Sequence, residues 1–155
     1  MQKLYITIGL PGSGKSSWAS FKAKSDFNIK IVSKDALREM MHGAYTYNVV
    51  TEPSVEAASH NLITTLLITG YDVIVDECNL RADDRGALAM LARGINPEVV
   101  VIYVVFSTSV ETCIQRRSVP SRGYSGAEWE HVIRKLWSIS QDWTNAECPS
   151  KVLNM

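Results

Sequence analysis

The chain of 155 residues is long enough for one domain, residues 1–155, with a substantial core, and too short for two comfortable ones. Hydrophobic residues make up 46% of it, a share that suits a globular protein and argues against a disordered one. The 16 basic side chains match 16 acidic ones, which argues against a broad basic surface for nucleic acid, so any such contact must rest on a local patch.

Cysteine spacing and the lengths of the apolar runs indicate the compartment in which the protein is found. The three cysteines, Cys78, Cys113 and Cys148, are widely separated and form no C-x-x-C pair, which fits neither a zinc site nor a disulfide framework and favours a reducing compartment. The N-terminus opens directly into a strand without a cationic leader, and the longest apolar run, Val99–Phe106, is too short to span a bilayer. We expect a soluble cytoplasmic protein without a membrane segment.

The first predicted strand leads into a glycine-rich motif. Leu4–Ile8 is apolar and β-branched, and the next eight residues, Gly9-Leu10-Pro11-Gly12-Ser13-Gly14-Lys15-Ser16, satisfy G-x-x-x-x-G-K-[S/T]. Glycines let backbone N–H groups turn toward phosphate oxygens, the lysine reaches the β- and γ-phosphates, and the final serine hydroxyl can bind Mg²⁺.

A predicted helix from Lys15 to about Lys24 would direct its positive end at the same phosphates. The alternative is an ordinary Gly/Pro turn between a strand and a helix. Because strand, loop and helix all occur in order, we interpret the motif as a nucleotide-phosphate cradle, with Mg²⁺ on Ser16. The predicted nucleotide-binding residues in it are Gly12, Ser13, Gly14, Lys15, Ser16 and Ser17.

Four apolar runs alternate with helical segments along the chain. This alternation predicts a parallel sheet with helices on both faces, and ligands of such sheets bind at the carboxyl ends of the strands. The four runs are Leu4–Ile8, Ile29–Val32, Val73–Val75 and Val99–Phe106.

The second predicted strand ends in a possible acceptor site. Ser33 can cap a helix that begins near Lys34, and Asp35 and Arg38 then share one face of its first turns. The carboxylate can take a proton from an attacking hydroxyl while the arginine holds a substrate phosphate. The alternative is a first-turn acid favoured by the helix dipole, together with a solvated arginine.

Residues 40–53 lack a clean period and are predicted to form a loop or broken helix. Tyr45 and Tyr47 can stack on a base there or cap the core from outside, and the core role is the favoured interpretation. A helix is predicted from Ser54 to about Thr69, with an inward stripe of Val55, Ala58, Leu62 and Leu66.

The third predicted strand ends in acids. Asp76 and Glu77 can help to hold the hydration shell of Mg²⁺ or orient Asp35 and Arg38, whereas Asn79 can instead cap the next helix. The next helix is predicted for 81–93, with Leu88 and Leu91 pointing inward. Its charged residues, Asp83, Asp84 and Arg85, are predicted to form a solvated face.

A cationic segment follows the last strand. A short helix over 109–117 leads into residues 117–125, and Arg116, Arg117 and Arg122 lie in or beside this Pro/Gly-containing loop. A mobile loop of this kind can fold over ATP as a lid and stabilise charge on the transferred phosphoryl group; the alternative is scattered surface charge.

A last helix is predicted after this loop. Ser125-x-x-Glu128 is a capping box that starts it, and it extends to about Trp143. Its predicted buried face is formed by Trp129, Ile133, Leu136 and Trp137, and residues 144–155 give little signal.

These motifs together resemble the 5′-hydroxyl polynucleotide kinase domain of the bacteriophage kinase/phosphatase type. The resemblance extends from Lys3 to about Trp143. It implies a P-loop kinase fold with about four parallel strands in the order 2-3-1-4, helices on both faces and an arginine-bearing lid. The residues that carry it are Gly9–Trp18, Asp35-x-x-Arg38, Tyr45-x-Tyr47, Asp76-Glu77-Cys78-Asn79-Leu80 with Arg85, and Arg122-Gly123.

The resemblance also implies roles and partners. Asp35 is the expected general base, Arg38 the ligand of the acceptor phosphate with Lys34 beside it, and Arg122 the lid contact to the donor. The phosphatase motif D-x-D-G-T is absent from the sequence, so no second 3′-end-processing activity is expected. If the protein is phage-encoded, the expected location is the host cytoplasm, and a homo-oligomer is compatible with the sequence.

We expect Mg²⁺-dependent transfer of the γ-phosphate from ATP, or another nucleoside triphosphate, to the 5′-OH end of DNA or RNA. The predicted catalytic residues are Lys15, Asp35, Arg38 and Arg122; Arg116 is a further nucleotide ligand; and the predicted acceptor ligands are Lys34, Asp35, Arg38, Glu77 and Asn79. One alternative is a P-loop kinase for a small-molecule hydroxyl or a hydroxymethylated base in DNA. Another is a nucleotide-binding module without catalysis.

Overall fold

The computed structural model describes residues 1–155 except 143, 145, 146 and 148. Five strands form one parallel sheet in the order β2-β3-β1-β4-β5, where β1 is Lys3–Ile8, β2 Ile29–Val32, β3 Asp72–Val75, β4 Val100–Val105 and β5 Lys151–Asn154. The helices are α1 Lys15–Ser25, α2 Lys34–His42, α3 Glu52–Ile68, α4 Ala82–Ile95, α5 Val110–Arg116 and α6 Gly126–Ser138. The predicted parallel sheet and the order of its first four strands are confirmed. Within the described ranges, no helix combines the length and the apolar character of a membrane span.

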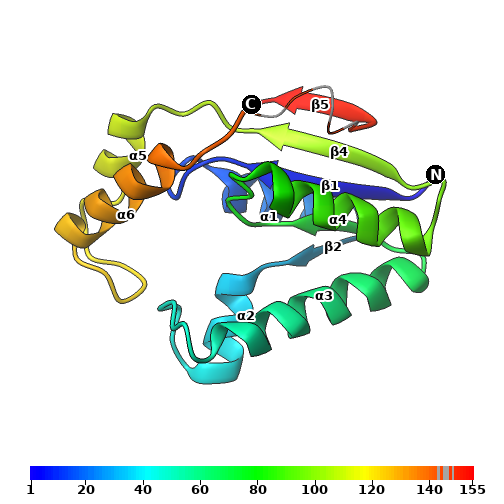
Figure 1. Cartoon of the computed structure of the whole chain (residues 1–155), viewed down its shortest axis with the longest axis horizontal. Coiled ribbons are helices and arrows are strands. Elements are labelled where there is room, and N and C mark those ends of the chain that lie inside the picture. Colours follow the sequence, from blue (N-terminus) through cyan, green and yellow to red (C-terminus); the bar gives the residue numbers. More distant parts are fainter. Residues whose placement is uncertain (143, 145–146, 148) are drawn as a thin grey trace.

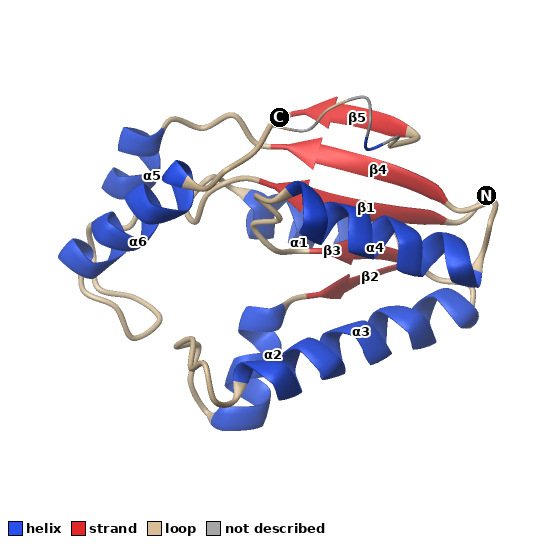
Figure 2. Cartoon of the chain, in the orientation of Figure 1, coloured by secondary structure: helices blue, strands red, loops and turns tan. Residues whose placement is uncertain are grey.

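Helices cover both faces of the sheet (Figure 1). On one face α3 and α4 pack over alternate strand residues such as Leu4, Ile6 and Val101, and on the other α1 packs over Tyr5 and Ile74. Helices α5 and α6 lie beyond the carboxyl ends of the strands, where a smaller apolar cluster with Cys113 and Ile133 joins them to the body (Figure 2). The strands therefore point at the space between α2 on one side and α5–α6 on the other.

Two predicted helix faces are wrong in part. The buried residues of α3 are Val55, Ser59, Ile63 and Leu67, while Leu62 is exposed. Because Leu62 and Ile63 are both apolar, the sequence offers two adjacent stripes, and packing against the sheet selects the second. In α6, Trp129 and Ile133 are buried as predicted but Trp137 is 58% exposed, since the helix meets the body along one narrow edge.

The fifth strand was missed. Residues 151–154 pair with β4 in parallel, and this short edge strand is only half-buried, so it lacks the apolar run that identifies the inner strands. Helix α6 ends at Ser138, five residues before the predicted end at Trp143. Both Trp143 and Cys148 lie outside the described residues, whereas Cys78 and Cys113 are free thiols.

The prediction that Arg85 lies on a solvated face is wrong. Its side chain is fully buried, and its Nε and Nη2 atoms donate to the two carboxylate oxygens of Glu147 at 2.7 and 2.8 Å. Nη1 donates to the carbonyl oxygen of Asn79 at 2.9 Å. One guanidinium thus ties the loop after β3 to the segment that precedes β5.

We expect Arg85→Met to lower the free energy of unfolding by about 3–5 kcal/mol, because the buried Glu147 carboxylate loses its partner. The double variant Arg85→Met/Glu147→Leu should recover much of this loss, since it leaves no buried charge. Urea denaturation of both variants and the wild type measures the difference. A single variant within about 1 kcal/mol of the wild type would contradict the structural role given to this pair.

Candidate active site

The Gly9–Ser16 loop has the geometry of an anion cradle. Gly12 and Gly14 have φ values of 83° and 104°, which residues with a Cβ rarely adopt. A Cβ at Gly12 would also lie 3.0 Å from the carbonyl oxygen of Cys113, so α5 closes tightly on the loop. The loop leads into the N-terminus of α1, whose first N–H groups carry partial positive charge.

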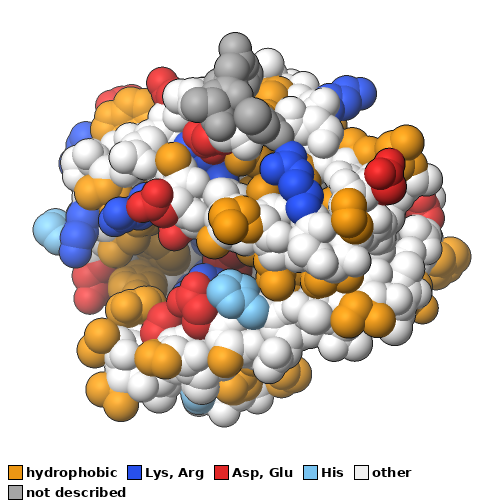
Figure 3. Space-filling view, turned by 45° about the vertical axis from the view of Figure 1, so that its right-hand side comes forward, with side chains coloured by type: hydrophobic (Ala, Val, Ile, Leu, Met, Phe, Trp, Pro, Cys, Tyr) orange, Lys and Arg blue, Asp and Glu red, His pale blue; other side chains and the backbone are white. Residues whose placement is uncertain are grey.

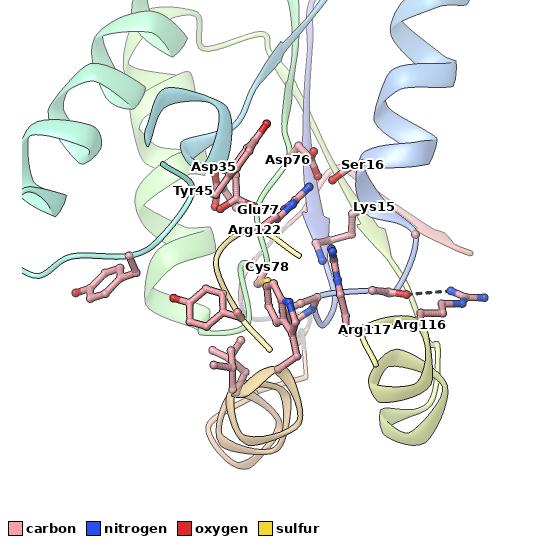
Figure 4. Close-up of a pocket in the computed structure, with 18 of the residues that line it drawn as sticks. Lys15, Ser16, Asp35, Tyr45, Asp76, Glu77, Cys78, Arg116, Arg117 and Arg122 are labelled. Atoms are coloured by element: carbon pink, nitrogen blue, oxygen red, sulfur yellow. Dashed lines mark hydrogen bonds and ion pairs between the residues drawn. The ribbon is translucent and has the colours of Figure 1, made fainter. Parts of the chain in front are cut away.

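Lys15 and Ser16 begin α1 beside the end of β3. The Lys15 ammonium donates to the carbonyl oxygen of Leu10 at 2.7 Å, and its side chain is buried in the cavity wall. Asp76 lies next to Ser16 (Figure 4), and its Oδ1 atom is buried without a hydrogen-bond partner among the described residues. Burial raises the pKa of Asp76, while the Ser16 hydroxyl and the Lys15 charge act in the opposite direction.

A hydroxyl beside an unpartnered carboxylate oxygen fits Mg²⁺, which prefers oxygen ligands and retains water around them. Ser16 and Asp76 would hold the ion, which would neutralise charge on the nucleotide phosphates when bound. The sequence indicated that Asp76 can help to hold the hydration shell of Mg²⁺, although Ser16 alone was predicted as a direct metal ligand. No group of three or more His, Cys, Asp or Glu side chains suited to a metal occurs in the described part of the chain.

A cavity of about 890 Å³ opens beyond these residues (Figure 3). One wall is the phosphate loop with Lys15 and Ser16, and the opposite wall is α2 with the loop after it. The segment between α5 and α6 closes a third side. The cavity therefore lies at the carboxyl ends of the strands, where the sequence placed the ligand.

Asp35 and Arg38 line the cavity together, as their spacing predicted. Arg38 Nη1 donates to Asp35 Oδ1 at 2.7 Å, and its Nε and Nη2 atoms donate to both carboxylate oxygens of Glu52 at 2.9 and 2.6 Å. The hydrogen bonds that Arg38 donates to Glu52 are the main cause of the raised pKa of Arg38. Glu52 was missed because it lies at the start of another helix, 14 residues away.

Three of the predicted acceptor ligands make structural contacts. The Lys34 ammonium pairs with Glu56 at 2.8 Å, and the Asn79 amide donates to the carbonyl oxygen of Thr7 at 2.8 Å. Neither residue is among those that line the cavity. Glu77 does line it, and its carboxylate accepts the backbone N–H of Lys34. Burial raises the pKa of Glu77 to about 7. The contacts of Lys34 tie the start of α2 to α3 and to the segment after β3, and the Asn79 contact ties that segment to β1.

The three arginines around the predicted lid face different ways. Arg116 is exposed and donates to the carbonyl oxygen of Gly12 at 3.0 Å, on the far side of the loop from Asp35 (Figure 4). Arg117 lines the cavity over Gly12. Arg122 reaches across the cavity to the carboxylate of Asp35 at the start of α2.

Aromatic side chains line the cavity between Asp35 and the lid. Tyr45 and Tyr47 do so rather than capping the core: the guanidinium of Arg122 lies 5.3 Å from the Tyr45 ring centre, and that of Arg38 lies 5.9 Å from Tyr47. Tyr124 and Trp129 belong to the same lining. The alternation of aromatic and polar residues in 45–47 was the available signal, and the exposure of the two tyrosines, 37% and 55%, decides against a core role.

The strand order, the phosphate loop after β1 and the arginine-bearing segment after α5 define a P-loop kinase fold. Residues 4–136 match the AAA_33 family, an AAA domain, and the chain therefore belongs to that family.

Three proteins illustrate the similarity. An adenylate kinase of Sulfurovum sp. (strain NBC37-1) is 28% identical, over 64% of this chain and 62% of its own length. A chain of the Pnkp1/Rnl/Hen1 complex is 25% identical with a TM-score of 0.68, over 77% of this chain and 40% of that chain. A putative kinase from Chloroflexus aurantiacus is 18% identical with a TM-score of 0.72, over 99% and 87%. This chain thus spans less than two thirds of the first two proteins.

Proposed function

We propose that the protein is an ATP-dependent polynucleotide kinase that transfers the γ-phosphate to a 5′-hydroxyl end of DNA or RNA. The observation that carries this proposal is the position of Asp35. Its carboxylate lies on the cavity wall opposite Lys15 and Ser16, between the guanidinium groups of Arg38 and Arg122. A hydroxyl bound at Asp35 would face the phosphate cradle.

Each group has a distinct task in this proposal. Asp35 accepts the proton of the attacking hydroxyl, because a carboxylate within hydrogen-bond reach is a suitable general base. Arg38, held rigidly by Glu52, presents its charge to the phosphate next to that hydroxyl. Lys15 and the backbone of the phosphate loop stabilise the transferred phosphoryl group, and Mg²⁺ at Ser16 and Asp76 would neutralise its charge.

The acceptor class is supported by both the lining and the relatives. Aromatic rings beside a guanidinium can stack on bases, and Tyr45 and Tyr47 line the cavity near the two arginines that contact Asp35. The Pnkp1/Rnl/Hen1 assembly is described as an RNA repair complex. A neutral chain is compatible with a nucleic acid substrate when only one end of the strand enters a local site.

A small-molecule acceptor is the second candidate, and the similarity to an adenylate kinase favours it. The same groups would then receive a nucleotide or metabolite hydroxyl or phosphate. The chemistry at Lys15 and Ser16 would not change, so the acceptor alone separates the two functions.

An acceptor panel with γ-labelled ATP and Mg²⁺ tests the proposal. We expect label on single-stranded 5′-OH DNA or RNA oligonucleotides and none on 5′-phosphorylated controls, because the free hydroxyl is the nucleophile. The panel should include nucleoside monophosphates, sugars and DNA with hydroxymethylated bases. Label confined to one of those acceptors would replace the polynucleotide assignment with that acceptor class. No transfer to any of them would favour a nucleotide-binding module without catalysis.

A further inference from the structure

Trp129 makes an unusual set of contacts for a residue near the start of a helix. Its indole is buried, with 6% exposed, and its Nε1–H donates to both the carbonyl oxygen and the hydroxyl of Ser121 at 3.0 and 3.1 Å. The guanidinium of Arg117 lies 4.8 Å from the ring centre. The ring of Tyr124 lies 4.9 Å away, tilted by 55°. One side chain therefore contacts three residues of the lid, residues 117–125.

The lid tip needs such support. Ser121 and Tyr124 exchange two backbone hydrogen bonds of 2.9 and 3.0 Å around Arg122 and Gly123, which have φ values of 54° and 82°. This backbone matches the tight hairpin turn in which both central residues have positive φ. Arg122 carries a Cβ in that conformation, which is unfavourable unless the surroundings enforce it. The contacts of Trp129 with Ser121 and Tyr124 hold both ends of the turn.

The same indole supports two of the arginines that line the cavity, Arg117 and Arg122. The side chain of Arg117 passes over Gly12, and its Nε atom is buried without a hydrogen-bond partner among the described residues. Burial, followed by the nearby charge of Arg122, lowers the pKa of Arg117. The Arg117 guanidinium lies over the Trp129 ring, and Arg117 also lines the cavity. Arg122 projects from the other end of the supported segment to Asp35.

We propose that Trp129 is a positioning residue that fixes the spacing between Arg117 on the donor side and Arg122 on the acceptor side. The identities of donor and acceptor rest on the proposed function, whereas the support of the lid does not. Because both arginines are held through Trp129, a ligand that fixes the position of Arg117 also favours the bound position of Arg122, and the reverse. Substitution should therefore weaken the coupling between ATP and acceptor binding as well as the rate.

The test compares Trp129→Phe with Trp137→Phe, which alters an exposed tryptophan of the same helix. Phenylalanine keeps an aromatic ring but removes the Nε1–H donor. Trypsin cuts after Arg117 and Arg122, and mass spectrometry identifies each cut. We expect lid cleavage to be about 3–10-fold faster in Trp129→Phe, as loss of hydrogen bonds of ordinary net strength implies, with unchanged cleavage elsewhere. An ATP analogue should protect the lid in the wild type and in Trp137→Phe, and protect it less in Trp129→Phe.

Kinetics supply the second measurement. We expect kcat to fall by about 10-fold in Trp129→Phe. The factor by which the ATP analogue increases the affinity for the acceptor should also be smaller in this variant than in the wild type. Ser121→Ala, which removes only the hydroxyl acceptor, should give an intermediate effect.

Wild-type lid cleavage and wild-type coupling in Trp129→Phe would overturn the proposal. Faster cleavage throughout the chain with a lowered Tm would overturn it too, since that result indicates a structural role only. If the wild-type protein phosphorylates no 5′-OH end, the proposed function fails, yet lid cleavage and its protection by the ATP analogue still decide the role of Trp129.

Discussion

Asp35→Asn is expected to reduce phosphoryl transfer by about 10³-fold or more while ATP binding stays within about threefold of the wild type. The carboxylate is the only group that we assign to proton acceptance, and an amide of the same shape cannot take the proton. ATP affinity should hold because Lys15, Ser16 and the phosphate loop remain intact. Removal of a negative charge beside the phosphates will, if anything, favour binding of the nucleotide.

The measurement pairs single-turnover transfer from γ-labelled ATP with calorimetric binding of an ATP analogue. Asp83→Asn is a matched control, since its carboxylate is 92% exposed on α4. Asp35 also accepts hydrogen bonds from Arg38 and Arg122, so circular dichroism and urea denaturation must show that the variant stays folded. Transfer at the wild-type rate would refute the assignment of Asp35 as the base.

The phosphate loop could be predicted because its information is local. The conformations of Gly12 and Gly14, the lysine and the following helix depend on eight consecutive residues and their immediate neighbours. The Asp35–Arg38 pair could be predicted for the same reason, since a spacing of three residues along a helix places both side chains on one face. The alternation of apolar runs with helices predicted the parallel sheet, and the family resemblance implied the order of its first four strands.

The contacts that complete the site are long-range, and no local pattern encodes them. Glu52 meets Arg38 from a different helix, and Glu147 meets Arg85 across 62 residues. A charged residue in a helix is usually solvated, so only its buried partner reveals that Arg85 is an exception. The direction of the Arg122 side chain depends on a backbone turn in which Arg122 itself has a positive φ. Such a conformation is rare for residues other than glycine, so the sequence does not predict it.

Lys15→Ala is expected to weaken ATP binding by about 10- to 100-fold and to reduce transfer further, by about 10³-fold. The ammonium is held by the protein itself: Lys15 is buried in the cavity wall and donates to the carbonyl oxygen of Leu10 at 2.7 Å. A fixed charge of this kind stabilises the transferred phosphoryl group more than the bound nucleotide, because charge on that group is redistributed in the transition state. The loss should therefore be larger in kcat than in affinity for ATP.

Lys24→Ala is the matched control, because Lys24 lies on the exposed side of the same helix. The comparison with Asp35→Asn separates the two halves of the cavity. Loss of Lys15 should impair both ATP binding and transfer, whereas loss of the Asp35 charge should impair transfer alone. If Lys15→Ala retained wild-type ATP affinity and rate, the phosphate loop would not be the donor site. If both variants lost ATP binding equally, Asp35 would be a nucleotide ligand, and the acceptor would have to be sought outside this cavity.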